Sequence, residues 1–362
     1  MNIVWFRRDL RVEDNPALYF ANQDAQPVTA VYIATPTTWN SHSMGEPQIK
    51  WVHDNLEHLE EALNQLGINL IYKCCDTFDD SNKVLLKLCK DLSATTLYFN
   101  KEYEWDERQR DTNACHLLLS QGIKNQSFDD QCIIPPHVIK NQKALPYCVY
   151  TPFKRACIFH IQTHPALLNM FPKPKQNQPL VLSDIKSDAH FRANSAPITI
   201  VKPGYNASQA RLDTFIEQRV TDYVASRDIP SLDGTSLLSP YLALGIISVR
   251  QCIAALLDHF NGNFDDVLCD TGAATWLSEL LWRDFYRMIC FNFPQVSRGM
   301  PFKKETKQLE WSNNEAHFTA WKEGKTGVPI IDSAMRQLNT TGWMHNRLRM
   351  IVAMYFTKNL WQ

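Results

Sequence analysis

Residues 1–130 alternate between two hydrophobic periods, and this alternation constrains the fold more than any other feature of the sequence. Short runs rich in Val, Ile, Tyr and Phe occur at residues 2–6, 27–34, 68–73 and 95–100. Continuous apolar runs of this length are typical of parallel strands that are covered on both faces of a sheet. Between them leucines recur at helical spacing, as from Leu56 to Leu66, and Gly67 then marks a helix end. The series predicts a doubly wound α/β domain with a parallel sheet.

The pattern changes twice after residue 130. Prolines interrupt residues 131–204, as in IIPPH and FPKPKQNQP, which predicts a long connector with one short helix near residues 152–160. Beyond residue 205 no strand series is convincing, and amphipathic helical patterns occur at 206–222, 239–258, 273–291, 314–323 and 328–360. We therefore expect an all-helical second domain over residues 205–362.

Charge and cysteine usage limit the possible partners and compartments. The chain has 37 Lys and Arg against 38 Asp and Glu, so a nucleic acid would have to be bound by a local basic patch. Ten cysteines contain no CxxC pair, which indicates free thiols in a reducing compartment rather than a metal site. No apolar run approaches the ~18 residues of a membrane span, and the N-terminus MNIVWFRRDLR is too charged for a signal peptide. We expect a cytoplasmic protein.

The stretch DGTSLLSPYLALG, residues 233–245, could hold an anion. Ser239 followed by Pro240 is typical of a helix start, with the hydroxyl at the N-cap and the proline at the first helical position. Thr235 and Ser236 add two hydroxyls beside the free N–H groups of that start, a combination that can bind phosphate. Ordinary helix capping explains the same residues without a ligand. The glycines form neither GxGxxG nor GxxxxGK[ST], so the α/β domain carries no dinucleotide motif.

A second stretch, WLSELLWRDFYRMI at residues 276–289, places unusual side chains on one helix face. Glu279, Trp282, Arg283 and Tyr286 follow the i, i+3, i+4, i+7 spacing. An acid, a flat aromatic ring, a guanidinium and a phenol together suit a planar ligand with hydrogen-bonding edges. The alternative is a solvated Glu–Arg pair, for which a large exposed tryptophan would be unusual.

The third stretch is WMHNRLRM near the end of the chain. Asn346 and Met350 share one face of a helix, and His345 and Arg349 lie on the next stripe. The last 22 residues contain Arg347, Arg349 and Lys358 but no acid, so they form a local basic segment. A solvated helix start would account for the same residues.

Together these stretches resemble the DNA photolyase and cryptochrome family, and within it the class I cyclobutane pyrimidine dimer photolyases of bacterial type. The resemblance begins with VWFRRDLRVEDNPAL, passes through YTPFKRA at 150–156 and the three stretches above, and includes WKEGKTGVPIIDSAMRQLNTTGWMHNRLRM. It implies an N-terminal α/β domain, a connector and a C-terminal helical domain that holds FAD among helices.

Position by position, the resemblance implies two sets of binding residues. The set expected to bind FAD is Tyr223, Thr235, Ser236, Leu237, Leu238, Ser239, Arg283, Trp343 and Arg349. The set expected to bind DNA is Arg227, Glu279, Leu280, Leu281, Trp282, Arg283, Asp284, Phe285, Tyr286, Asn346, Arg347 and Met350. Leu237 stands where the family usually has Arg or Lys, which removes one positive charge near the flavin phosphates.

The implied activity is the light-dependent repair of cyclobutane pyrimidine dimers in single- or double-stranded UV-damaged DNA. The dimer would be flipped out of the duplex against Trp282, and excited reduced FAD would supply the electron that splits it. Glu279 and Asn346 would hydrogen-bond to the base edges of the dimer, and protonated Glu279 would stabilise negative charge on a pyrimidine carbonyl. Trp311 corresponds to the outermost tryptophan of the chain that re-reduces the flavin.

The resemblance also implies a monomer with a second chromophore. Asp106 and Glu107 stand where this branch binds a 5,10-methenyltetrahydrofolate antenna, although Asn is usual in place of Asp106. His42 and Arg298 are further candidates for this site.

Two alternatives to repair remain: a blue-light-sensing cryptochrome without repair activity, and an inactive truncated photolyase. Asn346 favours repair, because (6-4) photolyases and animal cryptochromes usually have His there and plant cryptochromes usually have Asp. Family members continue past the end of this sequence with further flavin contacts and two more relay tryptophans. We therefore expect a C-terminally truncated helical domain, and we do not expect the 362-residue chain to hold FAD tightly or to repair DNA. The repair function is assigned to the intact protein.

Overall fold

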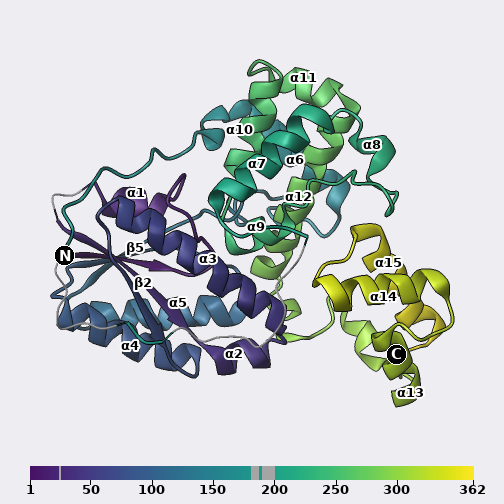
Figure 1. The fold of residues 1–362 in the computed structure, drawn as a ribbon, viewed down its shortest axis with the longest axis horizontal. Helices are drawn as coiled ribbons and strands as arrows, with labels where there is room; N and C mark the ends of the chain where they lie inside the picture. The colour runs from purple at the N-terminus through teal and green to yellow at the C-terminus, as the bar shows by residue number, and fades with distance from the viewer. Residues whose placement is uncertain (24–25, 181–186, 190–199) are drawn as a thin grey trace.

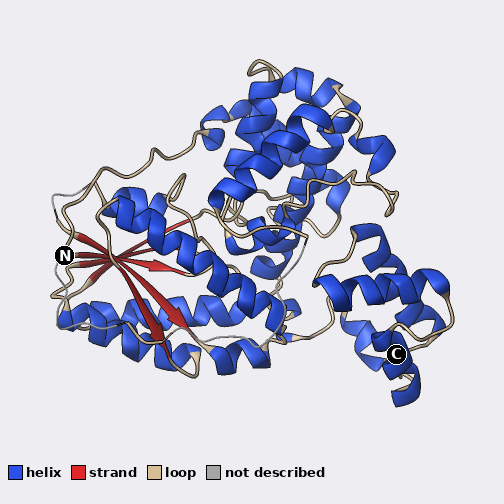
Figure 2. Ribbon diagram, viewed as in Figure 1, coloured by secondary structure: helices blue, strands red, loops and turns tan. Residues whose placement is uncertain are grey.

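The computed structural model describes residues 1–23, 26–180, 187–189 and 200–362. Its N-terminal half contains one parallel sheet in the order β3-β2-β1-β4-β5 (Figures 1 and 2). The strands are β1 Asn2–Phe6, β2 Val28–Ala34, β3 Leu70–Cys74, β4 Thr96–Asn100 and β5 Lys124–Phe128. Central strand β1 pairs with two neighbours, so that Val4 lies opposite Ala30 on β2 and Tyr98 on β4. The predicted parallel α/β half is confirmed.

Helices cover both faces of this sheet. They are α1 Pro16–Ala21, α2 Pro36–Ser41, α3 Glu46–Gln65, α4 Phe78–Asp91 and α5 Trp105–Leu119. Val4 and Phe6 point into the core that holds the leucines of α3, whereas Ile3 and Trp5 point into the core under α4 and α5. Burial on both faces explains why β1 is apolar from Ile3 to Phe6, while the buried side chain of Asn2 donates to the Ala21 carbonyl at 3.0 Å. Strand β5 was not predicted, because it is a polar, largely exposed edge strand.

The C-terminal half is helical, as predicted. Its longer helices are α6 Tyr150–Thr163, α7 Tyr205–Gln218, α10 Val249–His259, α12 Thr271–Asn292, α13 Glu315–Glu323, α14 Pro329–Thr341 and α15 Asn346–Met354. Shorter ones are α8 Tyr223–Ser226, α9 Ser239–Leu244 and α11 Phe264–Cys269, with 3-10 turns at Pro165–Leu168, Val296–Arg298 and Lys304–Gln308 and a π-helical turn at Tyr355–Asn359. The predicted connector helix is found as α6, which buries Phe153, Cys157 and Ile161 and packs on α12. Part of the predicted connector, residues 181–186 and 190–199, lies outside the described residues.

One predicted helix is in fact two. The pattern at 239–258 is broken at Gly245, which ends α9 with φ +63°. A Cβ at this position would lie 2.4 Å from the carbonyl oxygen of Arg8, so the α/β half approaches the chain too closely for any other residue. Helix α10 then restarts at a capping box formed by Ser248 and Gln251.

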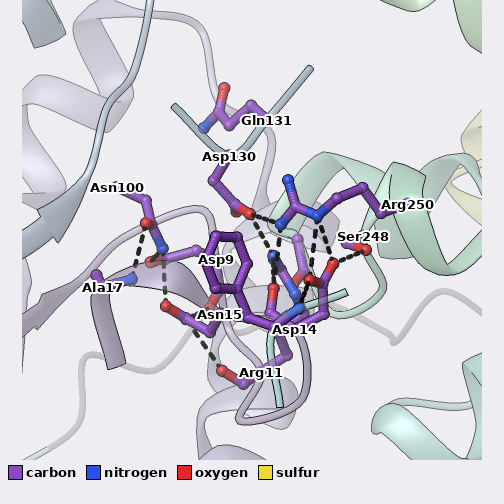
Figure 3. A network of polar contacts seen from close by, with 12 residues as sticks. Asp9, Arg11, Asp14, Asn15, Ala17, Asn100, Asp130, Gln131, Ser248 and Arg250 are labelled. Atoms are coloured by element: carbon purple, nitrogen blue, oxygen red, sulfur yellow. Dashed lines mark hydrogen bonds and ion pairs between the residues drawn. The ribbon is translucent and has the colours of Figure 1, made fainter. Parts of the chain in front are cut away.

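Buried charges join the two halves (Figure 3). The Arg250 side chain on α10 donates from Nε to both carboxylate oxygens of Asp14, at 3.0 and 2.9 Å, and from Nη2 to Asp130 at 2.6 Å. Asp130 also accepts from Arg11 at 2.6 Å. Burial opposes ionisation of Asp130, but the two guanidiniums outweigh it and hold its pKa below the ordinary value. This network fixes α10 against the loop that follows β1.

Helices α13 to α15 form a separate small bundle, which is drawn in yellow and yellow-green in Figure 1. Its core is made by Ile331, Ala334, Met335, Met344, Leu348 and Val352. Arg347 on α15 reaches out of the bundle to Asp228, just beyond α8, at 2.6 Å. The bundle therefore faces the rest of the helical half across a polar contact rather than a shared apolar core.

Candidate active site

Helix α12 presents the aromatic side chains that the sequence pattern singles out. The Trp282 ring is stacked on Tyr150, with centroids 3.5 Å apart and planes at 11°, and it also stacks on Tyr286 at 5.6 Å. Tyr286 is 61% exposed. Tyr150 is anchored through its hydroxyl, which donates to the Ser278 carbonyl at 2.5 Å. Tyr150 is missing from the predicted site, although it opens the YTPFKRA motif.

Ion pairs hold the charged residues around this aromatic group. Glu279 accepts from Arg227 Nη1 at 2.6 Å, and the Arg227 guanidinium lies 5.4 Å from the centroid of the Tyr223 ring. The structure thus brings Glu279 together with Tyr223 and Arg227, which precede it by more than 50 residues along the chain. In the free protein the Glu279 carboxylate is therefore already engaged by Arg227.

Four residues of the predicted DNA-binding run do not face outward. Leu280, Leu281, Asp284 and Phe285 are at most 6% exposed. Asp284 accepts from the backbone N–H of Ile133 at 2.7 Å, and burial raises its pKa to about 6. These four side chains position α12 and hold the start of the connector. The burial of these four side chains corrects the predicted run at these positions, and for the outward residues of the helix contact with DNA stays a prediction.

Arg283 points toward the connector and α9. It donates to the backbone carbonyl of Gln131 and, at 3.4 Å, to that of Leu242. Burial and the neighbouring Arg287 lower its pKa. The Arg283 side chain is 21% exposed and also lies 3.4 Å from the Asp284 carboxylate, which offsets part of its charge. The remaining positive charge beside α9 would stabilise an anionic ligand.

The loop before α9 differs by one residue from the predicted capping arrangement. The helix begins at Ser239, so the N-cap is Leu238 and Ser239 is the first helical residue. Leu237 has φ +52°, a strained value for a leucine. Arg211 on α7 donates at 3.0 Å to the carbonyls of both Thr235 and Ser236, which fixes the loop. The sequence did not single out Arg211.

A cavity of about 490 Å³ lies between the two halves. From the helical half it is lined by Ser239, Trp343 and Arg349, and from the α/β half by residues that include Arg8, His42 and Glu107. Residues just after β1, β2 and β4 contribute to it, and this is the sheet edge where ligands bind in doubly wound folds. Its volume is within the ~300–1,000 Å³ of ligand sites.

The cavity offers cationic groups to a ligand. Arg349 bonds through Nε to the Met344 carbonyl at 3.0 Å, while its Nη groups make no hydrogen bond to a described residue. Burial lowers the pKa of Arg349. Arg7, which also lines the cavity, has a buried Nη1 with no partner among the described residues. Arg349 is exposed, so its Nη groups are open to solvent and to a ligand, whereas Arg7 Nη1 is buried. Donors of this kind in a cavity of this size fit an anionic group such as a flavin pyrophosphate.

The two acidic residues predicted for the antenna differ in position. Glu107 lines the cavity 3.6 Å from Arg8, and burial raises its pKa. Asp106 is exposed and pairs with His42 at 3.0 Å. Arg298 lies outside the described cavity wall, with its guanidinium 5.4 Å from the Trp105 ring.

The remaining predicted residues lie on and before the C-terminal bundle. Asn346 begins α15 and is exposed, and its side chain makes no hydrogen bond to a described residue. Met350 is 47% exposed and receives a contact from Arg347 at 3.6 Å. Trp311 is 41% exposed, with its ring 5.3 Å from Trp361. The convergence of Asn346 with Trp282 on one ligand stays a prediction.

Comparison with known proteins places the chain in a family. The DNA photolyase family model matches residues 2–174, and the model of the FAD binding domain of DNA photolyase matches residues 276–362. The deoxyribodipyrimidine photo-lyase of Vibrio cholerae is 41% identical over 99% of this chain and 76% of its own length. This chain belongs to the DNA photolyase family. The corresponding photolyase of Escherichia coli is 38% identical, over 99% of this chain and 75% of its own length.

A solved photolyase has the same fold. The bacterial class III photolyase from Agrobacterium tumefaciens superposes with a TM-score of 0.84 at 30% identity, over 99% of this chain and 73% of that one. The family assignment from sequence is confirmed, and residues 276–362 are a photolyase FAD-binding domain. This photolyase chain spans about three quarters of the length of these relatives. None of its described helices is both long and apolar enough to cross a membrane.

Proposed function

We infer that this protein is a deoxyribodipyrimidine photo-lyase, which uses light to repair cyclobutane pyrimidine dimers in UV-damaged DNA. The observation that carries this inference is the 41% identity to the Vibrio cholerae photo-lyase over 99% of the chain. The aromatic and charged face of α12 supports it, because stacking surfaces and paired charges suit a flipped-out base step.

We propose that the cavity between the two halves receives FAD. Trp343 and Arg349 would line the flavin side, and Ser239 with the loop from Thr235 to Leu238 would face the phosphates. Arg283 would add positive charge behind α9. When bound, reduced and photoexcited FAD supplies the electron that splits the cyclobutane ring. The residues of the chain then contribute binding, orientation and the exclusion of water.

The lesion would be held between α12 and α15. Extruding a damaged base step costs a few kcal/mol, and stacking can return about 1–3 kcal/mol per base. Tyr150 occupies one face of Trp282 in the free protein, so a base that stacks on this face takes the place of the phenol ring. Asn346 would donate to or accept from the base edge, and Met350 would pack beside it. Tyr286 would extend the aromatic wall.

We propose a folate antenna, 5,10-methenyltetrahydrofolate, on the α/β side of the same cavity. Glu107 and His42 line this wall and offer hydrogen-bond partners for a pterin edge. Asp106 is held by His42 and would act through it rather than by direct contact. We also propose a monomer, as the family resemblance implies, and a cytoplasmic location, in line with the free cysteines.

Light-dependent repair by the whole chain tests this function. The purified protein, supplied with FAD and a reductant, is illuminated with a dimer-containing oligonucleotide, and the remaining dimers are counted. Trp282→Ala should bind dimer-containing duplex at least tenfold more weakly, since a stacking partner is lost. Phe159→Ala, which removes a 68% exposed ring from α6, is the matched control. Equal dimer selectivity in Trp282→Ala and the control would refute the pocket assignment, and photoreduction without any repair would favour a cryptochrome.

A further inference from the structure

Asp228 lies where two guanidiniums meet. It follows α8 and accepts from Arg347 Nη2 at 2.6 Å, while Arg227 Nε lies 3.5 Å away. The Asp228 side chain is 52% exposed, so solvent reaches this contact. Nothing in the sequence pattern marked the residue, because its two partners come from different parts of the chain.

The contact belongs to a line of four alternating charges. Glu279 on α12 pairs with Arg227 at 2.6 Å, Arg227 neighbours Asp228, and Asp228 pairs with Arg347 on α15. Both arginines belong to the set that the family resemblance implies for DNA binding, and as cations they suit the phosphates of the strand. In the free protein each is therefore already engaged by a carboxylate of the same chain.

A carboxylate between two guanidiniums offers the contacts that a phosphate would offer. A carboxylate is planar and a phosphate is tetrahedral, but each presents two anionic oxygens that accept paired N–H donors from arginine. The hydrogen bond from Arg347 holds the pKa of Asp228 below its usual range, so the carboxylate carries its charge at neutral pH. An ion pair this exposed is weak, and a DNA phosphate can displace it.

We propose that Asp228 is an internal stand-in for a DNA phosphate, which occupies Arg227 and Arg347 until the strand binds. This inference rests on the proposed DNA-repair function. It adds a residue that sets the affinity of the protein for the phosphate backbone of DNA. Because the internal anion is exchanged for an external one, fewer counterions are released when DNA binds. Asp228 thus weakens binding to any duplex, which limits capture of the enzyme by undamaged DNA.

The test is a salt titration of DNA binding. Fluorescence anisotropy is measured with a duplex that contains one thymine dimer and with the same duplex without it. Asp228→Asn should bind both duplexes about three- to tenfold more tightly at low salt. The plot of log K against log[salt] should become steeper by about one to two, because the freed arginines now release counterions. The ratio between the two duplexes should stay unchanged.

Asp222→Asn is the matched control. Asp222 is exposed and makes no ion pair with a described residue. Its replacement by Asn changes the net charge by the same amount as Asp228→Asn. Equal shifts in both variants would show a general charge effect and overturn the proposal, as would an unchanged slope in Asp228→Asn. Asp228→Glu should restore wild-type behaviour, and Asp228→Ser serves if the Asn variant is misfolded. A wild-type protein that bound both duplexes equally well would contradict the proposed function. The salt slope measured with the undamaged duplex would still test the role of Asp228.

Discussion

Replacing Arg250 by Met should lower the free energy of unfolding, because it removes the buried ion pairs that join the two halves. The guanidinium is 6% exposed, and it pairs with Asp14 and Asp130, which are 1% and 2% exposed. Removing one partner of a buried pair costs about 3–5 kcal/mol, because the remaining carboxylates stay buried without compensation. Asp130 keeps Arg11 at 2.6 Å, and Asp14 keeps Ser248 at 2.5 Å. We therefore expect the lower end, about 3 kcal/mol.

The assay is urea unfolding at pH 7, followed by far-UV circular dichroism and tryptophan fluorescence. Arg155→Met, which removes an exposed arginine without an ion pair to any described residue, should change the unfolding free energy by less than about 0.5 kcal/mol. Since the folded pKa of Asp130 is lowered, its stabilisation is present above the ordinary value and is lost as pH falls below about 4. The difference between wild type and Arg250→Met should shrink in that acid range. A cost below about 1 kcal/mol at pH 7 would refute the reasoning.

Two further substitutions test the packing beneath the site. The folded pKa of Asp284 is raised to about 6, so the contribution of this residue to stability is lost as pH rises from about 4 to 6. In urea unfolding, Asp284→Asn should be more stable than wild type by about 2 kcal/mol at pH 7.5 and by less at pH 5. No gain in stability at pH 7.5 would contradict this prediction. Gly245→Ala should lower the free energy of unfolding by about 2 kcal/mol or more, because φ is +63° and the new Cβ would lie 2.4 Å from the Arg8 carbonyl oxygen. A melting temperature equal to that of wild type would show that the loop relaxes to accept the methyl group.

Periodicity in the sequence predicted the parts of the fold whose burial is regular. Strand β1 is apolar from Ile3 to Phe6 because helices cover both of its faces, and its bounds were predicted correctly. Strand β5 reads KNQSF and has an exposed edge, so it gave no apolar signal. The break at Gly245 depends on the approach of Arg8 from the other half, a tertiary contact that local pattern does not contain.

The candidate site shows the same division. Helical spacing grouped Glu279, Trp282 and Tyr286 on one face of α12, and the rings of Trp282 and Tyr286 do stack. Glu279 pairs with Arg227, 52 positions away, and Trp282 stacks on Tyr150, 132 positions away, and no local pattern links either pair. Asp228 was missed for the same reason. The resemblance supplied the roles of the motif residues, but only the fold shows which of them are buried and which are already paired.

The central claim is that α12 and α15 act on one flipped-out lesion. A double-mutant cycle of Trp282→Ala and Asn346→Ala tests this claim most directly. The quantity compared is the binding free energy for the dimer-containing duplex minus that for the undamaged duplex. If both side chains contact the same dimer, the two losses should be coupled by about 0.5–3 kcal/mol. Losses that add to within about 0.3–0.5 kcal/mol would show two independent sites and contradict the shared pocket.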